Sequence, residues 1–207
     1  PFGIKKQLMR GRCEEPERRL VERFLDPAVA MIELGGSLGV LSAFIGSRLK
    51  PETPYLIAEA NPRGLDTCRT NARTGRGTGQ VEVLHGALAY GGDTVEFPID
   101  DNVHVNRVGS TKGGTVSVPA STLAGFVEQL AGHGQPYALV MDIEGAEFDV
   151  FLNEPEAFAA CSLAIVETHP HLFAERGKTV ADFLELVRKA GMRVLAQDGI
   201  SYAFGRV

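Results

Sequence analysis

The sequence has few cysteines, no long apolar run and no excess of basic charge. Its three cysteines, Cys13, Cys68 and Cys161, lie far apart and form no CxxC pair, which argues against a disulfide framework and a zinc knuckle. Free thiols indicate a reducing compartment, and we therefore expect a cytoplasmic protein. No apolar run approaches the roughly 20 residues that span a bilayer, and no charged-then-apolar leader opens the chain.

Acidic residues outnumber basic ones, with 26 Asp and Glu against 21 Lys and Arg and a formal net charge of −5. Proteins dedicated to nucleic acids draw their affinity from Lys and Arg clustered on phosphates, so nucleic acid is not an expected partner. The 207 residues are 44% hydrophobic and 23% charged, which is the composition of a globular protein. Neither a repeat nor a linker divides them, and we expect one domain over residues 1–207.

Apolar strands alternate with helical stretches almost from end to end of the sequence. This alternation predicts an α/β protein with a doubly wound, mostly parallel sheet and helices on both faces. Asp198-Gly199 is a hairpin signal between the last two strands and adds a terminal antiparallel strand. The expected strands are 29–35, 55–60, 80–89, 94–99, 115–119, 137–143, 162–168, 192–196 and 202–206, and the expected helices are 38–49, 62–73, 121–131, 146–152 and 179–191.

Two segments fall outside this alternation. Residues 1–28 carry seven Lys and Arg, and we interpret them as a helical lead-in with a solvated basic face. Residues 100–114 contain three glycines and show no periodicity. We interpret them as a loop that covers the acceptor as a lid, and a plain surface loop is the alternative.

Ligands of open parallel sheets bind outside the carboxyl ends of the strands, near the point where the strand order reverses. The first polar segment at such a strand end contains Glu33, Gly35, Gly36, Ser37 and Gly39, with the spacing acid-x-Gly-x-x-x-Gly. Ser37 stands where the dinucleotide fingerprint G-x-G-x-x-G requires its second glycine. Glycines let the backbone close on a ligand, and a carboxylate suits a cation. The segment therefore favours S-adenosylmethionine (SAM), which carries an ammonium and a sulfonium and no pyrophosphate.

The next two strand ends predict the contacts of a nucleoside. Glu59, followed by Ala60 and Asn61, ends the second strand, where a carboxylate accepts hydrogen bonds from both ribose hydroxyls. Gly86 and Ala87 follow the third strand, at the expected adenine position. NAD shares this ribose, so an NAD-linked oxidoreductase of similar fold remains one alternative. A non-catalytic SAM-binding module is another.

The most specific segment is Asp142-Ile143-Glu144-Gly145-Ala146-Glu147, which places three carboxylates after an apolar strand. Burying carboxylates is unfavourable unless they bind something. Here the chain resembles the FkbM family of SAM-dependent methyltransferases, whose hallmark is a D-[VI]-E-G-[AS]-E segment like this one. The resemblance takes in residues 14–17, 33–39, 59–62 and 167–169 as well. The family turn more often reads D-x-G-A-N-x-G, from which this chain departs at Glu33, Gly36 and Ser37.

The resemblance implies the class I methyltransferase (Rossmann-like) fold, SAM as methyl donor, and O-methylation of a hydroxyl on a sugar or natural product. The expected partner is therefore a small-molecule or glycan acceptor. Nothing in the sequence indicates the oligomeric state.

The fourth strand end, Glu167-Thr168-His169, should lie beside Asp142 and Glu144 because neighbouring strands end at the same edge. We expect Asp142, Glu144 and His169 to be catalytic, with His169 or Asp142 as general base, and Asp142 also to contact the cofactor. An alternative is a divalent metal held by Asp142, Glu144, Glu167 and His169, which we favour less. A polar loop without a catalytic role is the third interpretation of His169.

Overall fold

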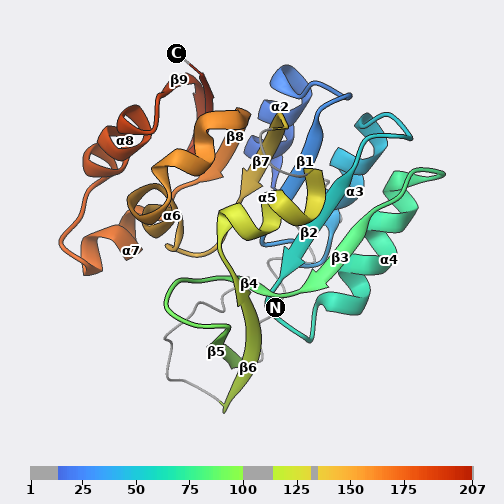
Figure 1. Ribbon diagram of the computed structural model, residues 1–207, viewed down its shortest axis with the longest axis horizontal. Coiled ribbons are helices and arrows are strands. Elements are labelled where there is room, and N and C mark those ends of the chain that lie inside the picture. Colours follow the sequence, from blue (N-terminus) through green and yellow to red (C-terminus); the bar gives the residue numbers. More distant parts are fainter. Residues whose placement is uncertain (1–13, 100–113, 132–134, 207) are drawn as a thin grey trace.

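A seven-stranded sheet forms the centre of the computed structural model, which describes residues 14–99, 114–131 and 135–206 (Figure 1). The strand order is β3-β2-β1-β7-β8-β10-β9. The first five of these strands run parallel, and β10 is antiparallel to both its neighbours, as predicted. The strands are β1 Ala30–Leu34, β2 Tyr55–Glu59, β3 Glu82–His85, β7 Tyr137–Met141, β8 Cys161–Glu167, β9 Met192–Asp198 and β10 Ser201–Arg206.

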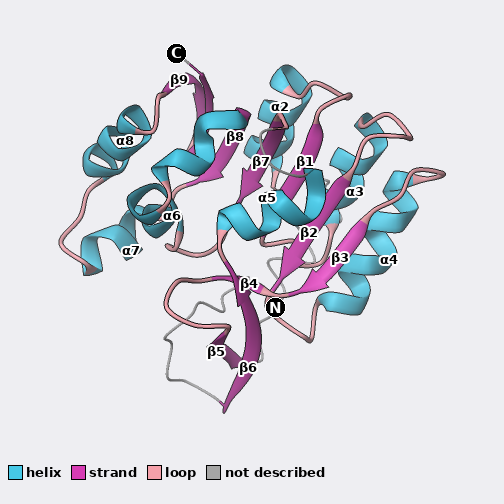
Figure 2. Cartoon of the chain, in the orientation of Figure 1, coloured by secondary structure: helices cyan, strands magenta, loops and turns pink. Residues whose placement is uncertain are grey.

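Helices cover both faces of the sheet (Figure 2). Alternate residues of β7 enter opposite cores, with Leu139 in one cluster of buried apolar side chains and Val140 in the other. The central strands β1, β2 and β7 are buried along their whole length, which explains their nearly continuous apolar sequences. The first face carries α5 Leu123–Ala131, α6 Glu147–Asn153 and α8 Val180–Lys189, and the second carries α2 Glu15–Phe24, α3 Val40–Arg48 and α4 Leu65–Arg76.

The strand predicted at 80–89 is interrupted at Gly86, whose N–H donates to the carbonyl of Glu59 at the end of β2. Beyond it the chain leaves the large sheet and forms a second sheet, with strand order β4-β6-β5. This sheet, which we call the arm, extends from the carboxyl edge of the large sheet (Figure 1). Ala87, Phe97 and Val118 form its small core. Its strands are β4 Ala87–Leu88, β5 Thr94–Ile99 and β6 Gly114–Ser121.

The helix predicted at 62–73 begins and ends three residues later than expected. Asn61 accepts a hydrogen bond from the N–H of Arg63 and so closes a turn ahead of the helix. At the other end, the buried guanidinium of Arg76 donates to five backbone carbonyls of residues 49–53 and Gln80. This network extends α4 and ties it to the loop before β2.

Two short elements complete the chain, the 3₁₀ helix η1 Pro155–Ala160 and α7 Pro170–Glu175. The predicted opening of α8 is confirmed, since Thr179 and Asp182 form a reciprocal capping box. Of the predicted lid, only Gly114 lies within the described residues, and residues 1–13 of the lead-in lie outside them. Within the described ranges, no helix is long and apolar enough to cross a membrane.

Candidate functional site

The glycine turn after β1 is pressed against two neighbouring elements. Gly35 has a φ of +94°, and a Cβ there would lie 1.8 Å from the carbonyl oxygen of Asp142. A Cβ on Gly36 would lie 2.5 Å from Ile57 Cγ2, and one on Gly39 would lie 2.8 Å from the carbonyl oxygen of Cys68. The glycines are thus required by close packing of the turn on β7, β2 and α4. Their predicted contact with a cofactor remains a prediction.

Glu59 lies where the sequence predicted it, beside the glycine turn. Its two carboxylate oxygens accept hydrogen bonds from the N–H groups of Ser37 and Asn61, each at 2.5 Å. The end of β3 is adjacent, since the N–H of Gly86 donates to the carbonyl of Glu59 at 3.1 Å. Burial raises the pKa of Glu59, although its backbone hydrogen bonds act in the opposite direction. Ala60 and Ala87 pack together at the base of the arm.

Glu33 lies beneath the turn rather than at its surface. It is 2% exposed, and its carboxylate accepts hydrogen bonds from Ser42 Oγ at 2.9 Å and from Tyr55 Oη. Burial raises its pKa to about 7, while the hydrogen bonds from Tyr55 and Ser42 lower it. We therefore propose that Glu33 supports the turn from below instead of contacting a cofactor directly.

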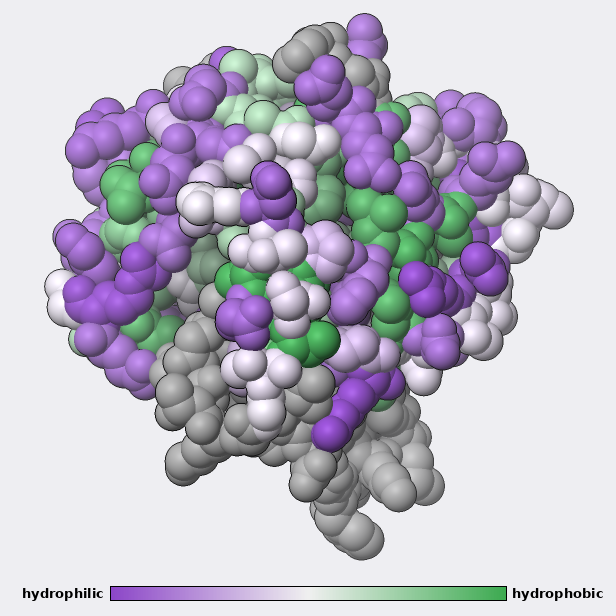
Figure 3. Space-filling model, turned by 60° about the horizontal axis from the view of Figure 1, so that its bottom comes forward, coloured by the Kyte–Doolittle hydropathy of each residue, from purple (hydrophilic) through white to green (hydrophobic). Residues whose placement is uncertain are grey.

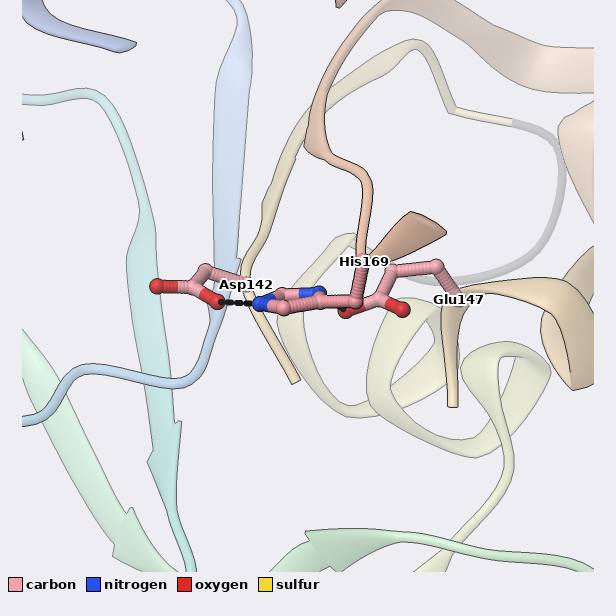
Figure 4. Close-up of side chains that lie close together, drawn as sticks. All are labelled: Asp142, Glu147 and His169. Carbon is pink, nitrogen blue, oxygen red and sulfur yellow. Dashed lines mark hydrogen bonds and ion pairs between the residues drawn. The ribbon is translucent and has the colours of Figure 1, made fainter. Parts of the chain in front are cut away.

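The three predicted catalytic residues, Asp142, Glu144 and His169, lie together at this edge of the sheet, and Figure 4 shows the imidazole of His169 between Asp142 and Glu147. His169 Nε2 lies 3.5 Å from Asp142 Oδ1 and 3.5 Å from Glu144 Oε2. On the opposite side of the ring, Nδ1 lies 3.1 Å from Glu147 Oε1, which also accepts the N–H of Ile143. The ring is therefore held between a buried carboxylate and two carboxylates that line the strand edge.

Glu147 is a site residue that sequence reasoning missed, although it lies in the predicted acidic segment. Its side chain is fully buried, and Oε2 has no hydrogen-bond partner among the described residues. A buried carboxylate with one unpartnered oxygen lowers the stability of the folded protein. We therefore infer that Glu147 serves the orientation of His169 and not the stability of the fold. The D-x-E-G-x-E spacing contained the signal, because the last acid falls on the first turn of α6, facing inward.

The lead-in contributes two further acids, which belong to the segment 14–17 of the family resemblance but were given no role by the sequence analysis. Glu17 is 3% exposed, accepts a hydrogen bond from Ser201 Oγ, and interacts with Glu167. Glu14 accepts the N–H of Leu41, in the first turn of α3, at 2.9 Å. The basic residues Arg18, Arg19 and Arg23 of this helix are exposed, as expected for a solvated basic face, whereas Glu17 is buried against β10 and Glu14 binds α3. The acidic run at residues 14–17, at the start of α2, is the signal that could have shown this.

Mutual repulsion and burial together perturb the charge state of this edge. Burial and the charge of Glu167 raise the pKa of Asp142 well above its usual range. Burial and Glu17 raise the pKa of Glu167 to about 7, and burial and Glu33 raise that of Glu14 to about 8. Burial lowers the pKa of His169, but Glu147, Asp142 and Glu144 outweigh it and raise the value to about 9.

A metal-ligand arrangement is present in part. Asp142, Glu147 and His169 each offer a ligand atom within 4.8 Å of the others. The predicted metal set differs from this one, because it contained Glu144 and Glu167 and lacked Glu147. Both interpretations share Asp142 and His169.

The strand order, the antiparallel β10 and the polar strand ends define the class I methyltransferase fold. An O-methyltransferase from Bacillus cereus, solved in complex with SAH, superposes with a TM-score of 0.55 at 12% identity, over 91% of this chain and 77% of that chain. The 23S rRNA methyltransferase ErmE superposes with a TM-score of 0.51 at 15% identity, over 92% of this chain and 67% of that chain. At such identities these similarities show the fold alone.

The sequence itself gives the family. Residues 39–194 match the profile described as the methyltransferase FkbM domain, and the chain belongs to this family. The predicted family and fold are thus confirmed. A search of curated proteins finds no significant match.

Proposed function

We propose that the protein is a SAM-dependent O-methyltransferase that acts on a hydroxyl of a small-molecule or glycan acceptor. The observation that carries this proposal is the pair of His169 and Glu147 at the carboxyl edge of the sheet, with Nε2 facing Asp142 and Glu144. A histidine oriented by a buried carboxylate is suited to accept a proton from a hydroxyl.

The charge of this edge supports SAM over NAD. Carboxylates dominate it, and burial together with their mutual repulsion raises the pKa values of several of them. Such a surface attracts the ammonium and sulfonium of SAM and repels the pyrophosphate of NAD. Family membership and the SAH bound to the Bacillus cereus enzyme support the same cofactor. The acids concerned are Glu14, Glu17, Glu33, Glu59, Asp142, Glu144, Glu147 and Glu167.

Each residue then has a distinct task. The glycine turn with Glu59 and Asn61 would hold the nucleoside, and the acids around Asp142 would face the positive end of the cofactor. Bound SAM supplies an electrophilic methyl group on a sulfonium. Glu147 holds the Nδ1 proton of His169, so Nε2 is the nitrogen that takes the proton of the acceptor hydroxyl. Positioning contributes up to about 7–11 kcal/mol in ideal cases, and the base a further ~10²–10⁴-fold.

The protonation state of His169 sets a condition on this role. With a pKa of about 9 in the free protein, the imidazole is mostly protonated at neutral pH. A cation bound beside Asp142 would lower this pKa by countering the carboxylates. The base is therefore available mainly in the loaded enzyme or at alkaline pH.

Calorimetry with SAM, SAH and NAD tests the cofactor directly. We expect SAM and SAH to bind and NAD not to bind. Binding of NAD alone would contradict the proposal and favour the oxidoreductase. Binding of SAM without transfer to any hydroxyl acceptor would favour the non-catalytic module.

Two variants test the base. His169→Gln should retain SAH affinity and lose ~10²–10⁴-fold in transfer rate. His171→Gln is the matched control, because His171 is exposed and only its ring edge approaches His169, with 6.2 Å between ring centroids. A chelator should leave the rate unchanged. Loss of activity with chelator and its recovery with a divalent ion would instead support the metal alternative.

A further inference from the structure

A cavity of about 550 Å³ lies between the arm and helices α6 and α7, and this volume is within the range of about 300–1,000 Å³ that is typical of small-molecule sites. Its lining contains neither the residues of the glycine turn nor Glu59, so the proposed nucleoside contacts do not account for it. Glu144 lines the cavity, and its Oε2 lies 3.5 Å from His169 Nε2. A hydroxyl beside Glu144 in this cavity is thus close to the proposed base.

The arm supplies one wall of this cavity. In Figure 3, where the bottom of the molecule comes forward, hydrophobic and hydrophilic residues alternate on this side. The small core of the arm contains no described residue of α6 or α7, so the position of the wall depends on how the arm is attached to the rest of the protein. The residues of the arm that line the cavity are Leu88, Ala89, Tyr90 and Val95.

One buried carboxylate, that of Glu154, holds the arm at both of its attachments. Its Oε2 accepts hydrogen bonds from Tyr90 Oη and from the N–H of Leu123, each at 2.7 Å. Its Oε1 accepts the N–H of Ala124 at 3.2 Å. Tyr90 follows β4, the first strand of the arm, and Leu123 begins α5 directly after β6, its last strand. Glu154 is 8% exposed, so these three donors satisfy its carboxylate away from water.

The bond to Tyr90 is a charge-assisted hydrogen bond, which is stronger than one between neutral groups. Burial and the carboxylate of Glu154 raise the pKa of Tyr90, so the phenol stays protonated and remains the donor. The two attachments are also joined to each other, because the N–H of Ala89 donates to the carbonyl of Ser121 at 3.1 Å.

Glu154 directly follows the helix that orients the proposed base. α6 begins with Glu147, whose Oε1 lies 3.1 Å from His169 Nδ1, and ends one residue before Glu154. The N–H of Glu154 donates to the carbonyl of Val150 at 2.9 Å, which continues the helical hydrogen bonding. One short helix therefore connects the proposed base to the attachment of the arm.

Resting on the proposed function, we propose that this cavity is the acceptor site, that the arm is its outer wall, and that Glu154 is the positioning residue that holds this wall at a fixed distance from His169. Without the hydrogen bond from Tyr90 the arm stays folded on its own core but loses its fixed position. Part of the binding free energy of the acceptor must then order the wall.

Pulsed electron–electron distance measurements test the position of the arm without any acceptor. Spin labels are attached to Ser117→Cys on β6 and Ala181→Cys on α8, both exposed, in a Cys13→Ser background in which Cys68 and Cys161 are buried. Tyr90→Phe should broaden the distance distribution. Glu154→Leu should broaden it at least as much, and Glu154→Gln, which keeps an acceptor oxygen for Tyr90, should broaden it less.

Tyr137→Phe is the matched control. It also removes one phenol hydroxyl, which donates to the carbonyl of Ala157 at 2.9 Å, but Tyr137 lies in β7 and does not line the cavity. The distance distribution should stay as narrow as in the unsubstituted protein. A distribution that Tyr90→Phe leaves narrow, or that Tyr137→Phe broadens equally, would overturn the positioning role.

A neutral phenol, 4-ethylphenol, probes the cavity itself. It combines a hydroxyl with an apolar body that suits the apolar lining residues Leu88, Val95, Ile143 and Leu172. Its affinity is measured by ligand-observed NMR on the SAH-saturated protein. We expect binding that Tyr90→Phe weakens by about 2–10-fold, the equivalent of one hydrogen bond, and that Tyr137→Phe leaves unchanged. Failure of 4-ethylphenol to bind, or equal affinity in Tyr90→Phe, would overturn the assignment of the cavity.

Calorimetry with SAH on the same proteins separates this proposal from the proposed function. All variants should bind SAH with unchanged affinity, because the cavity lining excludes the glycine turn and Glu59. Failure of the unsubstituted protein to bind SAH would refute the proposed function, whereas the distances are measured in the free protein and test the role of Glu154 independently.

Discussion

Replacing Glu147 by glutamine should lower the pKa of His169 and make His169 a weaker base. The substitution conserves the shape of a fully buried side chain and removes its charge. Asp142 and Glu144 remain 3.5 Å from Nε2, so part of the stabilisation of the imidazolium survives. An opposite charge within about 4–6 Å shifts a pKa by about 1–3 pH units. We therefore expect the pKa of His169 to fall from about 9 toward its ordinary value of 6.5.

The same change has a calculable effect on transfer. A pKa shift of one unit corresponds to about 1.4 kcal/mol. The substitution should therefore destabilise the imidazolium relative to the neutral ring by about 1–4 kcal/mol. The acid limb of the pH–rate profile should move to lower pH, while the plateau falls by about 10–100-fold because the ring is less well oriented. A merely structural role for Glu147 would not move the acid limb.

Imidazole ¹⁵N NMR across a pH titration measures this pKa without an acceptor, in the free protein and in the SAH complex. Glu156→Gln supplies the control, since it makes the same replacement at an exposed position. Melting temperatures of both variants identify any general loss of stability. An unchanged pKa of His169 in a folded Glu147→Gln protein would refute the assigned orientation and the base mechanism built on it.

Three other predictions follow from the fold and its charges. Glu59→Ala should weaken SAM and SAH binding by about 1.5–3 kcal/mol, because a charged acceptor for two hydroxyls is lost; equal calorimetric affinity would remove Glu59 from the ribose. The melting temperature of the free protein should fall as pH rises from about 5 to 9. Glu14, Glu33 and Glu167 have folded pKa values of about 7–8, so the folded state binds more protons than the unfolded state in this range and loses stability with rising pH. A rising melting temperature there would contradict the assigned burial. Arg76→Leu should destabilise the protein by about 3 kcal/mol or more, since it leaves several carbonyls without a donor, and urea unfolding would show it.

Local patterns were enough to predict the large sheet. Its strands are short apolar runs bounded by glycine and polar residues. β1, β2, β3 and β7 lie within the expected ranges, while β8 and β10 begin one residue early and β9 ends two residues late. The arm was predicted only as separate strands, because β5 and β6 pair across a segment with no periodicity. The break of the third strand at Gly86 was also missed. Apolar residues continue on both sides of Gly86, and only the hydrogen bond of its N–H to Glu59 shows where the chain leaves the large sheet.

The sequence predicted the site residues that directly follow the ends of strands. It missed the residues whose role depends on a contact with a residue far away in the sequence. Asp142, Glu144 and His169 lie together because β7 and β8 are neighbours, which the alternation implied. Glu17 is buried by Ser201, which is 184 residues away in sequence, and no local pattern reports such a contact. The role of Glu147 likewise depends on the ring of His169 packing over the first turn of α6.

The contact between Gly35 and the backbone of Asp142 joins two parts of the site that mutagenesis would normally treat as independent. The N–H of Asp142 donates to Leu34 at 3.0 Å, directly before the glycine whose missing Cβ leaves room for the Asp142 carbonyl. Any side chain at position 35 must displace the peptide that carries Asp142. A variant of Gly35 would therefore look like a catalytic mutant in kinetic data although it lies in the glycine turn after β1, and its effect would not add to that of Asp142→Asn.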